Sequence, residues 1–277
     1  MKILFTTIMY NRPLVSELYL LGLQRLKEFY DFDTLVVVSD DASAELCERY
    51  GVEHYYYENL PLGAKHNFML KKCLEKDFDW LIHSGDDDVM SSQLFMDYIM
   101  LFQTTDYEYI KTFGLYFYDI KSKRGLDFRP KNTFGAFRAF KRDVLERVGI
   151  QCLCHFNLDT NIGGKTYLAN NLYSLPKYIA DYYNDKTKCS IESEFVGLWS
   201  NELNKTLDFS SESKLIECGV KAHIVTYDKP QIIDFKSEQN IWKFESYYAS
   251  SKDVSKEEVL SFLSAKEIEH LDKFDIC

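Results

Sequence analysis

Three consecutive aspartates, Asp86, Asp87 and Asp88, are the residues of this sequence best suited to chemistry. They follow the apolar stretch WLIHSG, which predicts a buried strand that ends just before them. Adjacent carboxylates repel one another, and each needs water or a counter-ion. Their hard oxygen atoms suit Mg²⁺ or Mn²⁺, and such an ion can also bind phosphate oxygens. The alternative is a solvated turn in which Asp87 or Asp88 caps a helix that starts near Ser91.

Two further polar clusters follow apolar runs. Asp40 and Asp41 come directly after TLVVVS, residues 34–39, and the turn MYNRP at residues 9–13 follows the first apolar run. A carboxylate at the end of a strand can accept the N3–H of a uracil or thymine ring. The alternative for the acidic pair is an Asx turn that binds no ligand.

The elements that must position these clusters alternate in type over residues 1–90. We expect strands over residues 2–9, 34–39, 53–58 and 78–84, with helices between them. Short connections between strands and helices predict βαβ units and a mostly parallel sheet flanked by helices. Such sheets bind ligands at the carboxyl ends of their strands, so we expect the three polar clusters to meet in one crevice.

The pattern loosens after residue 90. We expect helices over residues 91–105, 142–149 and 188–205, and strands over 107–120, 134–141, 221–227 and 231–235. Ser255 with Glu258 and Ser264 with Glu267 form two capping-box patterns that open short helices near the end of the chain. We expect these elements to extend the domain formed by residues 1–90 and not to form a separate domain.

Composition narrows the class of protein. The 277 residues are 46% hydrophobic and 16% aromatic, which is too apolar for a disordered chain. No apolar run approaches the roughly 18 residues that a spanning helix needs, and the N-terminus predicts a strand rather than a signal peptide. The seven cysteines are scattered, as expected for reduced thiols in a cytoplasmic protein.

Charge argues against nucleic acid as a partner. The net charge of −10 is unsuited to nonspecific binding of a phosphate backbone. One basic segment, residues 121–131, is the exception, and it is either a solvated hairpin tip or a local patch for an anion.

In order and spacing, the motifs of residues 1–90 resemble the nucleotide-binding half of the GT-A glycosyltransferases, in particular glycosyltransferase family 2. The residues that carry this resemblance are Tyr10, Asn11, Arg12 and Pro13 after the first strand, Asp40, Asp41, Ala42 and Ser43 after the second, Gly63, Lys65, His66 and Asn67 at the start of a helix, and Gly85 to Asp88 as the metal motif. Two positions depart from the family pattern: Ala42 replaces a glycine, and Gly85 stands where the first aspartate of the longer metal motif often occurs.

The resemblance implies a GT-A fold in which residues 1–90 bind the nucleotide sugar, 91–235 form the acceptor-binding and catalytic half, and 236–277 are a C-terminal helical extension. It also implies a metal-dependent transferase using Mn²⁺ or Mg²⁺. Such an enzyme moves a sugar from a nucleotide-diphosphate sugar, here a UDP-sugar, to a hydroxyl of a carbohydrate or glycan, with inversion.

The resemblance also implies roles for single residues. The residues expected to bind the nucleotide are Ile8, Tyr10, Arg12, Asp40, Asp41, Lys65, His66 and Asp86. The residues expected to bind the metal are Asp86, Asp87 and Asp88, with Asp87 as the first choice. Asp159 matches the position of the general base, although Leu158 stands where the family has a glutamate, and capping a helix is its alternative role.

Other residues are secondary candidates for catalysis, metal binding or sugar stacking. His155 is a lesser candidate for the base, with a place in the core as the alternative, and His223 and Asp234 are candidates for a third metal ligand. Trp80 and Trp242 are expected to pack in the core, while Trp242 or Tyr116 is a candidate for stacking on a sugar.

Two other classes of function compete with the glycosyltransferase. A nucleotidyltransferase also uses acidic metal ligands on an α/β sheet, but it would show a glycine-rich phosphate loop after the first strand, and TTIMYNRP has none. A non-catalytic nucleotide-sugar-binding protein is the other alternative. A modified base in DNA as the acceptor is supported only by the basic segment.

Overall fold

The structure is a computed structural model that describes residues 1–129, 135–155, 160–162, 165–167, 172–176, 190–195, 198–199, 211–212, 214–216, 218–238, 240 and 243–275. The chain forms two compact units. The first holds residues 1–59, 77–140 and 221–277, and the second holds residues 60–76 and 141–220. The division of roles at residues 90 and 235 stays a prediction.

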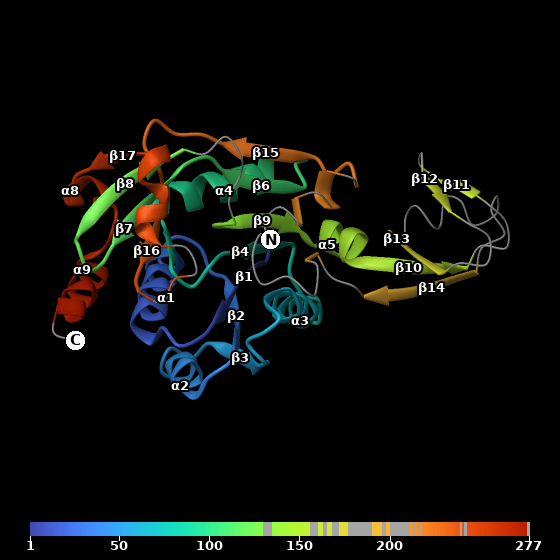
Figure 1. The fold of residues 1–277 in the computed structure, drawn as a ribbon, viewed down its shortest axis with the longest axis horizontal. Coiled ribbons are helices and arrows are strands. Elements are labelled where there is room, and N and C mark those ends of the chain that lie inside the picture. Colours follow the sequence, from blue (N-terminus) through green and yellow to red (C-terminus); the bar gives the residue numbers. More distant parts are fainter. Residues whose placement is uncertain are drawn as a thin grey trace. The chain divides into compact units, whose positions relative to one another are not determined.

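A seven-stranded sheet forms the centre of the first unit (Figure 1). Its strands, in spatial order, are β3 (Glu53–Tyr56), β2 (Asp33–Val38), β1 (Ile3–Met9), β4 (Trp80–His83), β9 (Arg138–Lys141), β6 (Tyr109–Thr112) and β15 (Ala222–Val225). β1 pairs in parallel with both β2 and β4, β2 with β3, and β6 with β15, whereas β9 is antiparallel to β6. The expected fold class, an α/β fold with a mostly parallel sheet flanked by helices, is confirmed.

The order of the strands sets where a ligand can bind. The chain winds from β1 outward through β2 to β3 and then returns to place β4 on the other side of β1. This reversal is a topological switch point, and ligands of open α/β sheets bind outside the carboxyl ends of the strands that flank it. The segments that follow β1 and β4 therefore lie where a site is expected.

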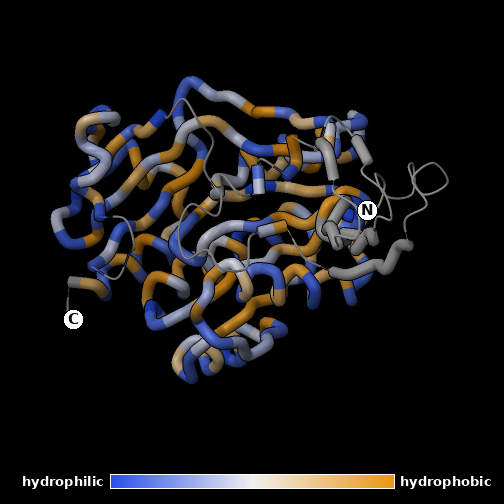
Figure 2. The backbone as a smooth tube through the Cα atoms, turned by 45° about the vertical axis from the view of Figure 1, so that its right-hand side comes forward, coloured by the Kyte–Doolittle hydropathy of each residue, from blue (hydrophilic) through white to orange (hydrophobic). Residues whose placement is uncertain are grey.

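Three helices of the first unit pack on this sheet: α1 (Pro13–Lys27), α2 (Asp41–Arg49) and α4 (Ser92–Thr104). Pro13 sits at the first turn of α1, where its missing N–H costs nothing. The helices share one apolar core with the sheet, and aromatic pairs mark it, such as Phe5 with Phe95 at 5.7 Å and Trp80 with Phe102 at 4.0 Å between ring centroids. In Figure 2 the orange stretches run along the inner strands.

A second sheet of the first unit contains β17 (Ser251–Val254), β8 (Arg124–Phe128), β7 (Leu115–Asp119), β16 (Ile232–Lys236) and β5 (Asp88–Met90), in that order. Only β7 and β16 are parallel. Val15 and Leu18 of α1 belong to the core of this sheet, whereas Tyr19 and Leu23 belong to the first core. Helix α1 therefore lies between the two cores.

The end of the chain packs against the second sheet and α1. It contains the 3-10 helices η1 (Phe244–Ser250) and η2 (Lys273–Asp275) and the helices α8 (Lys256–Val259) and α9 (Ala265–Asp272). The capping box of Ser264 and Glu267 is confirmed, and Ser255 caps α8 by accepting from the Glu258 N–H. The buried Glu267 also pairs with Arg25 of α1 at 2.9 Å, which holds α9 on that helix.

The second unit contains α3 (Leu62–Leu74), α5 (Arg142–Gly149) and the strands β10 (Ile150–His155), β11 (Thr160–Ile162), β12 (Lys165–Tyr167), β13 (Leu172–Pro176) and β14 (Ser190–Phe195). β10 pairs antiparallel with β13 and β14, and β11 with β12. The helix predicted over residues 188–205 is wrong at 190–195, because SIESEF forms the strand β14. Its pairing with β10 along its whole length favours the strand over the helix.

Candidate functional site

The segment between β4 and β5 carries Asp86 and Asp87 and joins the two sheets of the first unit, and Asp88 is the first residue of β5. Arg12 and Ser16, at the start of α1, lie against it. The Arg12 guanidinium donates to Oδ2 of Asp87 at 2.8 Å and pairs with Oδ1 of Asp86, and Ser16 donates its hydroxyl to Oδ2 of Asp86. The turn after β1 and the turn after β4, which follow neighbouring strands, are therefore brought together.

Asp86 is the most enclosed of the three carboxylates. Its side chain is 2% exposed, and both of its oxygens are taken by Arg12 and Ser16. Burial raises the pKa of Asp86 even though Arg12 favours the charged form. Asp86 therefore holds Arg12 in place, and its assignment as a nucleotide and metal ligand stays a prediction.

Asp88 faces another carboxylate. Its Oδ2 accepts bonds from the Ser84 hydroxyl at 2.6 Å and from the Gly85 N–H at 2.9 Å. Asp88 of β5 lies directly opposite Asp234 of β16 in the antiparallel register. Two like charges at opposed positions of neighbouring strands destabilise a sheet unless something neutralises them.

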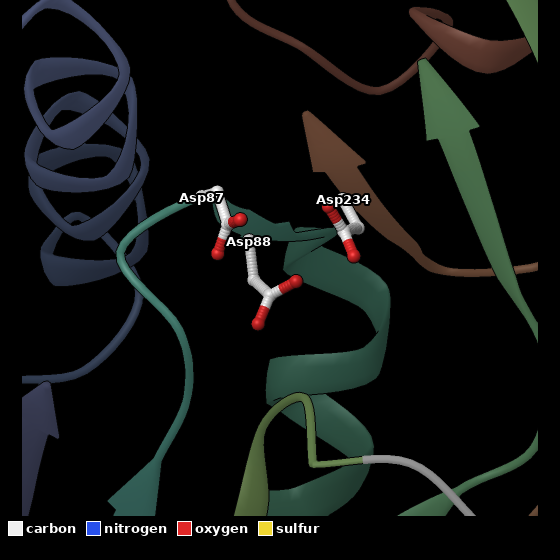
Figure 3. Close-up of side chains that lie close together, drawn as sticks. All are labelled: Asp87, Asp88 and Asp234. Atoms are coloured by element: carbon white, nitrogen blue, oxygen red, sulfur yellow. The ribbon is translucent and has the colours of Figure 1, made fainter. Parts of the chain in front are cut away.

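Asp87, Asp88 and Asp234 form one cluster (Figure 3). Each residue offers an oxygen, and these oxygens lie within 4.8 Å of one another. Asp87 also accepts from the Asn240 amide at 2.6 Å, on the oxygen that Arg12 binds. The sequence offered Asp234 only as one candidate for a third ligand, and the structure places it beside two of the three aspartates.

The cluster carries more negative charge than its cations balance. Lys236 is buried and donates to Oδ2 of Asp234 at 2.7 Å, but Oδ1 of Asp234 is buried and accepts no hydrogen bond from the described residues. Among the described residues, Arg12 and Lys236 are the cations that contact this group of four carboxylates, Asp86, Asp87, Asp88 and Asp234. One divalent ion would neutralise the remaining charge.

The pKa values reflect this imbalance. Burial, together with the charges of Asp234 and Asp87, raises the pKa of Asp88 well above its usual range. Burial raises the pKa of Asp234 to about 6 although Lys236 acts against it. Burial also opposes the charge of Asp87, but Arg12 and Lys236 outweigh it and lower the pKa of that carboxyl.

These residues fit a hard divalent cation. Mg²⁺ and Mn²⁺ prefer carboxylate oxygens, and Oδ1 of Asp234, which has no hydrogen-bond partner among the described residues, offers such an ion a ligand atom. Gly85 allows the carboxylates of Asp87 and Asp88 to lie close to its backbone. A Cβ at this position would lie 2.5 Å from Oδ1 of Asp87 and 3.1 Å from Oδ2 of Asp88. The glycine that departs from the family pattern thus has a steric reason in this chain.

The residues predicted to hold the nucleoside lie around the ends of β1 and β2. Ile8 is partly buried in β1, while the Tyr10 side chain is 45% exposed. Asp40 caps α2 by accepting from the N–H and hydroxyl of Ser43, and it also accepts from the Asn11 N–H at 2.9 Å. Asp41 is exposed in the first turn of α2. The side chain of Asp40 is thus used within its own turn, as in the Asx-turn alternative, and the base-binding role of Asp41 stays a prediction.

Lys65 and His66 belong to α3 of the second unit. The Lys65 side chain is fully buried, and the His66 ring lies 4.9 Å from the ring of Trp199. Asn67 exchanges two bonds with the Trp199 backbone, which fixes this helix within its unit. The phosphate-binding role of Lys65 and His66 stays a prediction.

Several other candidates are placed by the structure. Trp80 packs in the core as predicted, and Tyr116 is 1% exposed with its hydroxyl bonded to Glu258, which leaves its ring no surface for a sugar. His223 stacks on Tyr107 at 4.4 Å. Asp159 and Trp242 lie outside the described residues, and His155 is placed on β10 by its backbone.

Three basic residues in the described part of the segment 121–131 pair with neighbouring acids. Lys121 pairs with Glu238 at 2.6 Å, Arg124 with Asp253 at 2.7 Å, and Arg129 with Asp127 at 2.9 Å. The first two of these pairs are exposed, and such pairs contribute little to stability. They do reduce the positive field that a nucleic-acid phosphate would meet.

Sequence reasoning missed Ser16, Lys236 and Asn240, which hold the carboxylates in place. One signal was available in IIDFK of β16, where Ile233 and Phe235 alternate with Asp234 and Lys236. Such alternation normally puts the polar residues in solvent, but here both faces of the strand are covered. Within the described part of the chain, no helix combines the length and apolar character that crossing a membrane requires.

Comparison with known proteins finds likeness at the level of the fold. No protein-family model and no curated sequence matches the chain. Among solved structures, a mannosyltransferase of Pyrobaculum calidifontis, in complex with GDP-Man and Mn²⁺, is 15% identical with a TM-score of 0.39, over 53% of this chain and 46% of that one. The TarS protein of S. aureus is 14% identical with a TM-score of 0.44, over 85% and 60%.

A third similar structure is a 4-diphosphocytidyl-2C-methyl-D-erythritol synthase of Anaerococcus prevotii, 11% identical with a TM-score of 0.44, over 100% of this chain and 99% of that one. Of the mannosyltransferase described above, this chain spans about half the length. The solved structures that it resembles include transferases of nucleotide-diphosphate sugars, and at this identity the likeness shows the fold alone.

Proposed function

We propose that this protein is a metal-dependent glycosyltransferase that moves a sugar from a nucleotide-diphosphate sugar, a UDP-sugar, to a hydroxyl of a carbohydrate or glycan. The cluster of Asp87, Asp88 and Asp234 at the switch point of the sheet is the observation that supports metal dependence and binding of the diphosphate. The sugar-transfer part is supported by the motif resemblance of residues 1–90.

The metal would be held by Asp87, Asp88 and Asp234, and Mn²⁺ or Mg²⁺ fits their oxygen atoms. When bound, the ion neutralises the charge that develops on the departing diphosphate. Asp86 does not need to bind it, because its bonds to Arg12 and Ser16 give it a positioning role. Arg12 and Asn240 orient the Asp87 carboxylate by donating to the same oxygen, Oδ2.

The protein's own residues supply the remaining steps. Tyr10, exposed after β1, and Asp41, exposed after β2, would contact the nucleoside, with Asp41 accepting the N3–H of uracil. Asp159 takes the proton of the acceptor hydroxyl as that oxygen attacks the anomeric carbon, and the bond from this carbon to the diphosphate breaks with inversion. Cytoplasmic location belongs to the same proposal.

The test is release of the nucleoside diphosphate from a panel of nucleotide sugars with Mn²⁺ present. We expect a UDP-sugar to release UDP, Asp87→Asn to abolish most of that release, and the exposed Asp272→Asn to leave it unchanged as a control of equal charge change. Release of pyrophosphate from a nucleoside triphosphate and a sugar phosphate would instead identify a nucleotidyltransferase. Binding of UDP-sugars without turnover would identify a non-catalytic binding protein.

A further inference from the structure

Tyr19 carries a buried hydroxyl near Asp86 and Asp88 that the proposed chemistry does not use. It lies on α1 three residues after Ser16, on the side of the helix that also carries Arg12. The side chain is 1% exposed, and its ring stacks against Phe137 with centroids 6.3 Å apart and planes 19° apart. The ring is therefore held by packing, and its hydroxyl points into the interior.

The hydroxyl of Tyr19 is buried and has no hydrogen-bond partner among the described residues. A buried hydroxyl normally finds a partner, because leaving it unsatisfied costs free energy. Tyr98 shows the ordinary case in the same core, since its hydroxyl donates to the carbonyl oxygen of Phe137 at 3.0 Å. Two tyrosines beside one phenylalanine thus differ in whether the hydroxyl is satisfied.

Hydrogen bonds connect Phe137, the neighbour of Tyr19, to Asp88 of the metal cluster. The Phe137 N–H, beside the Tyr19 ring, donates to the Ser84 hydroxyl at 3.0 Å, and that hydroxyl donates to Asp88 at 2.6 Å. Burial and the nearby charges of Asp88 and Asp86 raise the pKa of Tyr19 well above its usual range, so its hydroxyl stays protonated and available as a donor.

We propose that Tyr19 is a positioning residue of the metal site, whose hydroxyl donates to a water molecule in the hydration shell of the bound ion. This proposal rests on the metal site of the proposed function. Mg²⁺ and Mn²⁺ usually keep several waters, and the partners of those waters and of the protein ligands fix the geometry and affinity of a metal site. The hydrated ion would thus supply the acceptor that the Tyr19 hydroxyl lacks among the described residues.

The experiment is Mn²⁺ binding by isothermal titration calorimetry, without nucleotide sugar, for the wild type, Tyr19→Phe and Tyr98→Phe. We expect Tyr19→Phe to weaken Mn²⁺ binding about tenfold, the lower end of what such outer contacts contribute. Thermal unfolding of the metal-free proteins gives the second readout. Tyr19→Phe should leave the unfolding midpoint unchanged or raised, since it removes an unsatisfied hydroxyl. Tyr98→Phe should lower the midpoint and leave Mn²⁺ affinity unchanged.

Two results would overturn the role of Tyr19 alone. One is wild-type Mn²⁺ affinity in Tyr19→Phe, and the other is a loss of metal-free stability as large as that of Tyr98→Phe, which would mean that the hydroxyl has a partner in the protein. Failure of the wild type to bind Mn²⁺ or Mg²⁺ would remove the metal site and this role together. Mn²⁺ binding without sugar transfer would leave the role of Tyr19 standing and refute only the glycosyltransferase.

Discussion

Asp88 and Asp234 face each other across the antiparallel ladder of β5 and β16, and both carboxylates are largely removed from water. The wild type therefore keeps a repulsive pair in the interior of its second sheet. Lys236 pairs with Asp234, but the pKa values of both aspartates remain raised. A cation that binds both carboxylates explains why the pair is tolerated.

Asp88→Asn should make the metal-free protein more stable and unresponsive to metal. Asparagine keeps an oxygen that can accept from Ser84 and Gly85, but it removes the repulsion with Asp234. We expect a gain of about 1 kcal/mol in the free energy of unfolding at pH 7.5. The measurement is urea unfolding with and without Mn²⁺, and a variant that is less stable than wild type but still stabilised by Mn²⁺ would contradict the expectation.

The stabilisation by metal should grow as the pH rises. The folded-state pKa of Asp234, about 6, exceeds the value of an unfolded aspartate, so the folded metal-free protein holds a proton that the unfolded chain has lost. Stability contributed by this group is therefore lost as the pH rises from about 4 to about 6. Metal binding replaces that proton, and the shift of the unfolding midpoint by Mn²⁺ should be larger at pH 7.5 than at pH 5. An equal shift at both pH values would count against Asp234 as a ligand.

Arg12→Gln should destabilise the protein strongly. The change leaves Asp86, 2% exposed, without its cation, and breaking a buried ion pair by removing one partner typically costs about 3–5 kcal/mol. The double variant Arg12→Gln with Asp86→Asn should recover much of this loss, because the uncompensated charge is gone. Urea unfolding of the two single variants and the double variant measures the coupling, and strictly additive losses would show that Arg12 and Asp86 do not act as a pair.

Gly85→Ala should weaken metal binding. Its Cβ would lie 2.5 Å from Oδ1 of Asp87, so the carboxylate must move away from its present place. Gly51→Ala is the contrasting change, since Gly51 has a φ of 63° and open space around it. That variant should lose about 1 kcal/mol of stability through backbone strain and keep its Mn²⁺ affinity. Calorimetric titration of both variants with Mn²⁺ checks this, and equal affinities would be inconsistent with close packing at Gly85.

The strands and helices of residues 1–90 could be predicted because their signals are local. Buried runs such as TLVVVS and the helical spacing of the segment after Pro13 need no knowledge of the rest of the chain, and the parallel sheet follows from their alternation. Residues 190–195 form a strand although the sequence predicts a helix there, because so short a segment, with two glutamates and two apolar residues, favours either form until its pairing with β10 is known.

The site could be predicted only in part for a related reason. The grouping of aspartates after β4 is visible in the sequence, but Asp234 reaches Asp88 through pairing between strands that are far apart along the chain. Asp86 differs from Asp87 and Asp88 because Arg12 and Ser16, at the start of α1, occupy both of its oxygens. Three identical side chains in a row give no sequence signal that one of them faces a helix.

The most direct test of the central claim is calorimetric titration of UDP into the protein with and without Mn²⁺, for the wild type, Asp87→Asn and Asp272→Asn. If Asp87 holds an ion that bridges to the diphosphate, UDP should bind the wild type and Asp272→Asn in Mn²⁺ and lose about tenfold or more in affinity when the metal is chelated or Asp87 is replaced. UDP affinity that is unchanged by chelation and by Asp87→Asn would contradict the metal-dependent function.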